Sequence, residues 1–124
     1  MAIHNELGKK GEQLAAEHLA ANGYAIVERD TRKGHFEIDI IAMKDSRIVF
    51  VEVKTRTGDF CSPLDAITPK KISRICSAAD SYVKLRQIPH EVQFDIIAVV
   101  FQPDGTYRLD HIPDAFRPPL RTSR

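Results

Sequence analysis

Of the charged side chains in or directly beside two short apolar segments, at residues 36–43 and 48–53, three could act together. They are Asp39 in the first segment, Glu52 in the second, and Lys54 just after it. Side chains alternate between the faces of a strand, so Glu52 and Lys54 would share one face about 7 Å apart. If the two segments pair, Asp39 comes close to Glu52. Charge among apolar residues is costly unless it is paired or bound to a metal.

The same residues also fit a solvated strand face on which acids and bases alternate. The surrounding positions are apolar on both faces, which is typical of a central strand rather than an exposed one. The residues alone leave a functional site and a solvated face as open alternatives.

The elements that would position these side chains follow from the chain's periodicity. The polar break at residues 44–47 predicts a β-hairpin with a four- or five-residue connection. A first helix is predicted over residues 5–22 and ends at Gly23. A second helix is predicted to begin at Thr68-Pro69, with threonine as the N-cap residue.

Three further strands complete the prediction, and polar or glycine-containing connections separate the elements. The strands are at residues 24–29, 92–101 and 106–112, and the connections include residues 30–35 and 57–64. The order α-β-β-β-α-β-β predicts an α/β sandwich in which helices pack on a central mixed sheet. Residues 1–116 would form a single domain, followed by a flexible tail at residues 117–124.

Each predicted helix has a feature that helix formation does not explain. Gly8 and Gly11 are poor helix formers and indicate close approach to a strand or to a phosphate backbone. Lys70, Lys71 and Arg74 lie near the start of the second helix, where the helix dipole favours anions. An external phosphate would explain these cations, and so would a solvated helix end.

The composition describes an ordinary globular domain. The chain has 124 residues, of which 43% are hydrophobic and 28% charged, and its net charge is +1. A nucleic-acid binder with this charge would need a local basic patch. No apolar run reaches membrane-spanning length and no signal-peptide core is evident, so we expect a cytoplasmic protein without membrane contact.

The cysteines and histidines suggest little chemistry. Cys61 and Cys76 form no disulfide framework, which fits a reducing compartment, and we expect both to be buried apolar residues. The five histidines are scattered without metal-ligand spacing, which argues against a zinc site.

Together these features resemble the YraN-like family of small bacterial proteins. That family is itself similar to the archaeal Holliday junction resolvases and the wider PD-(D/E)XK nuclease superfamily. The resemblance runs from about residue 8 to residue 98. The matching pieces are Gly8-x-x-Gly11-Glu12, Gly23-Tyr24, Arg29-Asp30-x-Arg32, Glu37-Ile-Asp39, Phe50-Val-Glu-Val-Lys-Thr-Arg56, Lys71 and Phe94-Asp95.

The chain departs from the family pattern at three positions. Phe36 replaces a glycine before Glu-Ile-Asp, Cys61 replaces a glycine after Phe60, and Gln93 replaces an arginine before Phe-Asp. These departures affect local loop shape and one phosphate contact, and they leave the family's catalytic set complete.

The resemblance implies a restriction-endonuclease-like fold and a catalytic set of Glu12, Asp39, Glu52 and Lys54. In superfamily nucleases Mg²⁺ or Mn²⁺ is the cofactor. By position, Asp39, Glu52 and the Val53 carbonyl would be its ligands, and Lys54 would act on the attacking water or on transition-state charge.

The remaining residues carried over from the family would support this set. Glu12 would orient a metal-bound water or hold a second ion. Glu37 would support the metal ligands from the same face as Asp39, and Arg32, Arg56 and Lys71 would contact phosphates.

The function implied is a metal-dependent endonuclease that cuts branched, junction or single-strand-containing DNA in repair or recombination. The resolvases act as dimers, so a homodimer is expected. Two alternatives stay open: a non-catalytic module that keeps the fold and binds nucleic acid or protein, and a structural ion-pair cluster in an unrelated α/β protein.

Overall fold

Two helices and five strands make up the part of the chain that the computed structural model describes, residues 2–33, 36–58 and 67–118. In chain order they are α1 (Ala2–Ala21), β1 (Ala25–Lys33), β2 (Phe36–Lys44), β3 (Arg47–Thr57), α2 (Pro69–Leu85), β4 (Glu91–Phe101) and β5 (Tyr107–Ile112). This order confirms the predicted α-β-β-β-α-β-β arrangement. It is consistent with the restriction-endonuclease-like fold that the resemblance implied.

The five strands form one mixed sheet in the order β1-β2-β3-β4-β5. Neighbouring strands are antiparallel except β3 and β4, which run parallel because α2 carries the chain back between them. β4 lies inside the sheet and is buried from residue 93 to residue 101, as its continuous apolar sequence predicted.

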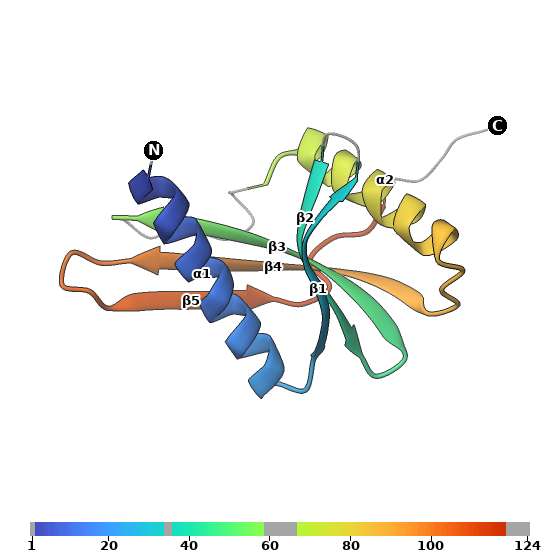
Figure 1. Ribbon diagram of the computed structural model, residues 1–124, viewed down its shortest axis with the longest axis horizontal. Helices are drawn as coiled ribbons and strands as arrows, with labels where there is room; N and C mark the ends of the chain where they lie inside the picture. The colour runs from blue at the N-terminus through green and yellow to red at the C-terminus, as the bar shows by residue number, and fades with distance from the viewer. Residues whose placement is uncertain (1, 34–35, 59–66, 119–124) are drawn as a thin grey trace.

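The helices cover opposite faces of the sheet, so the fold has three layers (Figure 1). On one face α1 packs Ala15 and Leu19 against Val49, Val51 and neighbouring aliphatic residues. On the other face the α2 residues Ile75, Ala79 and Tyr82 meet a second apolar cluster. α1 has charged residues along its length, and neither described helix is apolar over the length that a bilayer crossing requires.

Local signals in the sequence explain where the helices begin and end. The Thr68 side chain accepts a hydrogen bond from the Lys71 amide at 3.1 Å, which caps α2 as predicted. Gly23 follows α1 with a φ of +89°, a left-handed conformation that glycine adopts without steric cost.

Two predictions about the strands were wrong. Residues 30–33 belong to β1 rather than to a connection, because their backbone pairs with the start of β2 as far as Lys33–Phe36. The β2–β3 connection has two residues rather than four or five, since Lys44 pairs with Arg47. Asp45 makes this tighter turn with a φ of +55°.

Some of the predicted features fall on residues outside the described ranges. The predicted connection at 57–64 lies largely outside the described residues, as does Cys61. Most of the predicted tail, 119–124, lies outside them too. Arg117, where that tail was expected to begin, is exposed and pairs with Asp114 at 2.8 Å.

Candidate active site

The candidate site lies where β2 and β3 separate. Their described backbone pairing extends from the hairpin turn to Ile40–Val51 and no further. β1 stays paired with β2, and β3 stays paired with β4 as far as Thr57–Phe101. Figure 1 shows the ends of β1 and β2 turning away from β3. Beyond the last pair, the Asp39 carboxylate accepts the Val53 amide hydrogen bond at 2.8 Å, so a side chain replaces the missing backbone partner.

Helix α1 covers this opening and turns it into a pocket of about 1130 Å³. A Cβ at Gly11 would lie 2.1 Å from the Thr55 hydroxyl, so only glycine lets α1 approach β3 this closely. The pocket's lining carries charges of both signs. Its acidic residues are Glu12, Asp30, Glu37 and Asp39, and its basic residues are Lys9, Arg29, Lys54 and Arg56.

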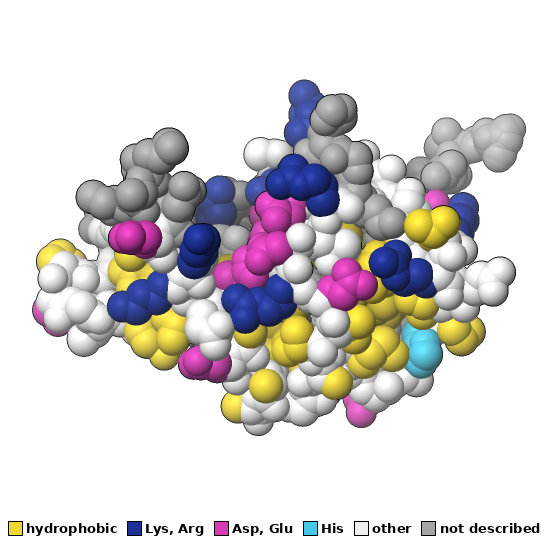
Figure 2. Space-filling model, viewed as in Figure 1, with side chains coloured by type: hydrophobic (Ala, Val, Ile, Leu, Met, Phe, Trp, Pro, Cys, Tyr) yellow, Lys and Arg dark blue, Asp and Glu magenta, His cyan; other side chains and the backbone are white. Residues whose placement is uncertain are grey.

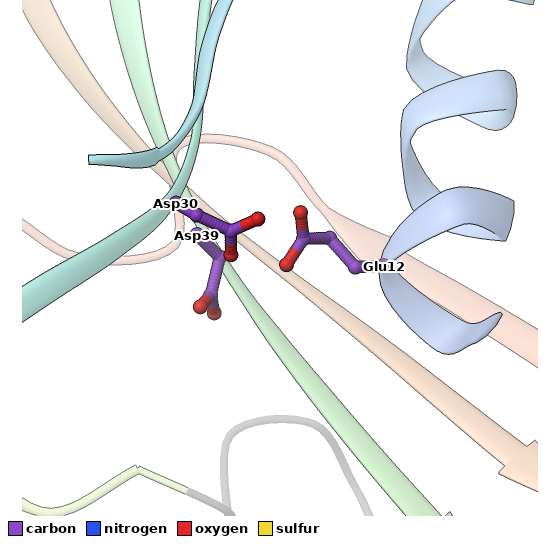
Figure 3. Close-up of side chains that lie close together, drawn as sticks. All are labelled: Glu12, Asp30 and Asp39. Carbon is purple, nitrogen blue, oxygen red and sulfur yellow. The ribbon is translucent and has the colours of Figure 1, made fainter. Parts of the chain in front are cut away.

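Three carboxylates converge in the pocket. Oxygen atoms of Glu12, Asp30 and Asp39 all lie within 4.8 Å of one another. Figure 3 shows Glu12 reaching from α1 toward Asp30, with Asp39 beside it. Asp30 lies opposite Asp39, since it stands between the pairs Arg29–Ile40 and Thr31–Ile38 of the β1–β2 ladder. An all-oxygen donor set of this kind suits Mg²⁺, Mn²⁺ or Ca²⁺.

Burial and neighbouring acids raise the pKa of two of these carboxylates, Asp39 and Glu12. Burial and then the charge of Glu52 raise the pKa of Asp39 to about 8, against the lowering effect of the Val53 amide. Burial and a hydrogen bond with Asp30 raise the pKa of Glu12 to about 7, although Arg29 donates to Glu12 at 3.0 Å. Negative charge is therefore unfavourable in this pocket unless a cation accompanies it.

Glu52 lies near Asp39 but forms its ion pair with a residue of α2. Lys71, on α2, contacts the Glu52 carboxylate at 2.6 Å, and the Glu52 side chain is only 10% exposed. Regular pairing of β3 with β4 keeps Glu52 and Lys54 on one face of the strand and Val53 on the other. The family resemblance predicted that Lys71 would contact a phosphate. In the structure Lys71 instead forms an ion pair with Glu52.

The other basic residues take different places around the pocket. Lys54 and Arg56 line it, and Lys54 makes no ion pair or hydrogen bond with any residue in the described ranges. Arg32 is exposed on β1 opposite Glu37 and does not line the pocket. Figure 2 shows acidic side chains gathered near the centre of one face, with lysine and arginine around them.

The structure thus brings Glu12, Asp39 and Lys54 to one pocket, with Glu37 at its wall as expected. Val53 lines the pocket too, but the contact that the structure gives it runs through its amide, so ligation by its carbonyl stays a prediction. Sequence reasoning missed Asp30 and Arg29 as members of the site. Asp30 was missed because residues 30–35 were predicted to form a connection, which hid the pairing that sets Asp30 opposite Asp39. Arg29 was predicted in a strand, but nothing in the sequence showed that it would reach Glu12.

A second polar cluster surrounds Asp95 of β4, which is fully buried under α1. Asp95 accepts hydrogen bonds from the Tyr24 hydroxyl, Gln93, the Asp114 amide and His111, all at 2.8–2.9 Å. The other ring nitrogen of His111 lies 3.1 Å from His18 of α1. Gln93, where the family has an arginine, is part of this buried network rather than a surface contact. The network joins two histidines that are 93 residues apart, which no spacing rule could detect.

Comparison with known proteins places the chain in a family. Residues 11–99 match "Uncharacterised protein family UPF0102". "UPF0102 protein BF0634" of Bacteroides fragilis is 52% identical over 121 residues, which cover 97% of this chain and 99% of the relative. A "UPF0102 protein" of Parabacteroides distasonis is 43% identical over 122 residues, 98% and 100% of the two chains. The chain therefore belongs to the UPF0102, or YraN-like, family.

Proposed function

We propose that this protein is a metal-dependent endonuclease that hydrolyses phosphodiester bonds in DNA. The observation that carries the proposal is the pocket at the β2–β3 separation, where Glu12 and Asp39 meet beside Lys54. Partly buried carboxylates with raised pKa values next to an amine are typical of catalytic sites rather than of structural ion pairs. The resemblance to the PD-(D/E)XK superfamily supports the same assignment.

The residues present fit a divalent cation. Three carboxylates offer oxygen ligands within 4.8 Å of one another, and partial burial makes the unpaired charge of Glu12 and Asp39 unfavourable. Asp39 would be the central ligand, because it lies between the Glu12–Asp30 side of the pocket and Glu52. When bound, Mg²⁺ or Mn²⁺ would supply Lewis-acid activation of water and neutralise charge on the phosphoryl oxygens.

The protein's own groups would do the remaining work. Lys54 would hold the attacking water, take its proton, or stabilise the charge that develops on the phosphate. Glu12 would orient a water molecule from the α1 side. Arg56 and Lys9, on the pocket wall, would position the phosphate backbone without reading its sequence.

The substrate we propose is branched, junction or single-strand-containing DNA, cut during repair or recombination in the bacterial cytoplasm. Two symmetric cuts across a junction need two active sites, so we expect the active form to be a homodimer. With a net charge of +1, the whole protein contributes little attraction, and DNA affinity would come from the cations around the pocket.

A nuclease panel with matched variants tests the proposal. Purified protein should nick junction or flap DNA with Mg²⁺ or Mn²⁺ and leave it intact in EDTA. Asp39→Asn and Lys54→Ala should each lower the cleavage rate at least about 100-fold and retain most DNA binding. The controls are Asp110→Asn and Lys84→Ala, which remove the same charges at surface ion pairs away from the pocket.

Two results would reject the proposal. Cleavage by Asp39→Asn and Lys54→Ala at the wild-type rate would show that the activity comes from elsewhere. DNA binding without cleavage, together with no saturable Mn²⁺ binding that depends on Asp39 and Glu52, would indicate instead the non-catalytic binding module.

A further inference from the structure

The two glycines of α1 differ in what the fold requires of them. Glycine is among the poorest helix formers, so each needs a reason to stand within a helix. Gly11 has one in the protein itself, because any side chain there would collide with Thr55 on β3. At Gly8, no atom of the described residues lies within 4 Å of the place a Cβ would occupy.

Backbone conformation does not explain Gly8 either. It lies in the middle of a regular helix, and the glycines with positive φ in the described chain are Gly23, Gly58 and Gly105. Within the described ranges, neither packing nor dihedral angles therefore demand glycine at position 8. An alanine there would satisfy the fold and favour the helix more strongly.

Gly8 does, however, face the candidate active site. It lines the pocket together with Glu12, which is one turn further along the same face of α1. The opposite wall of this pocket carries Lys54 and Arg56. The missing side chain leaves the helix backbone bare at a place where cations surround the acidic group.

We propose that Gly8 is a substrate-binding position at which the sugar–phosphate backbone of DNA passes in contact with the α1 backbone. Glycine permits such close approach because it has no Cβ. The cations on the opposite wall fit an anionic polymer rather than an apolar ligand. This inference rests on the proposed function, since it concerns the path of the substrate into the same site.

Substitution of Gly8 by larger residues tests this inference through two quantities, the melting temperature and the DNA affinity, which should change in opposite directions. Gly8→Ala should raise the melting temperature by about 4 °C, because alanine favours the helix. The same variant should bind flap or junction DNA about tenfold more weakly, measured by fluorescence polarisation with Ca²⁺ in place of Mg²⁺. Gly8→Val should bind more weakly still, and the Mn²⁺ affinity of Gly8→Ala should match that of the wild type.

Ser81→Ala, at an exposed position of α2, is the control. It also improves helix propensity but adds nothing to the pocket, so it should leave DNA affinity unchanged. Weaker binding by Gly8→Ala with an unchanged or higher melting temperature supports the inference.

Three results would overturn it, and they are distinguishable. If the wild type binds DNA and the Gly8 variants bind equally well, the inference fails and the nuclease proposal stands. If Gly8→Ala loses stability along with binding, the glycine is structural. If the wild type binds none of the DNA panel, the proposed function fails and this inference fails with it.

Discussion

Asp95 is a fully buried acid of the central sheet and Asp39 a partly buried one, and their surroundings differ in almost every respect. Asp95 accepts four hydrogen bonds, one of them from His111. These donors hold its pKa below the usual value, although burial alone would raise it. Asp39 accepts one hydrogen bond, from Val53, among the described residues, and its acidic neighbours Glu52 and Glu12 help raise its pKa to about 8.

The difference separates an acid whose hydrogen bonds are satisfied by the fold from one that the fold leaves with few donors. A buried carboxylate supplied with donors joins elements together and leaves no capacity for a ligand. A buried carboxylate with few donors and other acids beside it destabilises the fold, and a sequence keeps it only where something else is gained. Asp95 joins β4 to β5 through His111, which in turn meets His18 of α1, whereas Asp39 has the Val53 amide as its one donor among the described residues.

The largest predicted effect on stability comes from replacing Asp95, the acid whose hydrogen bonds are satisfied. Asp95→Asn should lower the free energy of unfolding by about 3 kcal/mol, because the amide leaves buried donors without acceptors and His111 without its anion. Urea denaturation monitored by circular dichroism measures the change. Asp110→Asn, which breaks an exposed pair with Arg108, should cost less than about 1 kcal/mol. Equal losses from the two variants would break the comparison.

Replacing Asp39, the acid with few hydrogen-bond donors, should instead raise the stability of the protein. Between about pH 4 and 8 the unfolded chain releases the Asp39 proton that the folded protein keeps, so stability falls as pH rises. Asp39→Asn should therefore be more stable than the wild type by about 1–2 kcal/mol at pH 8, and equal to it near pH 4. Thermal unfolding at both pH values measures this. In addition, Mn²⁺ should raise the melting temperature of the wild type but not of the variant.

A variant that is less stable than the wild type at pH 8 would show that Asp39 is an ordinary structural acid. Unchanged metal stabilisation would place the cation away from Asp39.

The smallest effect concerns the outer end of the Asp95 network. Burial and the neighbouring His111 lower the pKa of His18 below 6.5. The unfolded chain takes up a proton as pH falls through 6.5 and the folded protein does not, so stability decreases in that range. His18→Gln, which keeps a polar atom near His111, should weaken this decrease by about 0.5 kcal/mol between pH 7 and 5. An unchanged pH profile would show that His18 titrates freely.

Much of the fold could be predicted because its signals are local. Thr68-Pro69 set the start of α2 through a cap within one turn, and the continuous apolar run of β4 indicated an inner strand. The failures were also local. The polar residues 30–33 looked like a connection, although their backbone pairs with the start of β2 only a few residues further along the chain, as far as Lys33–Phe36.

The candidate site was predicted in part. Asp39, Lys54 and Glu12 were named from their types and a family resemblance, and they do line one pocket. Asp30 was missed because its place depends on strand register. The partner of Lys71 was missed because α2 and β3 approach each other only in the folded sheet, where the ammonium lies 2.6 Å from Glu52.

The sequence by itself determined the order of the elements, the apolar faces that pack them, and the chemical types available for a site. Those properties follow from periodicity, capping and side-chain chemistry, which act over a few residues. Only the tertiary structure decided which charges meet. The close approach of Gly11 to Thr55 and the contact of His18 with His111 join segments that are far apart in the sequence. The point at which β2 and β3 separate is likewise visible only in the folded sheet. Electrostatic interactions depend on distance in space, so two aspartates of the same sheet have pKa values shifted in opposite directions.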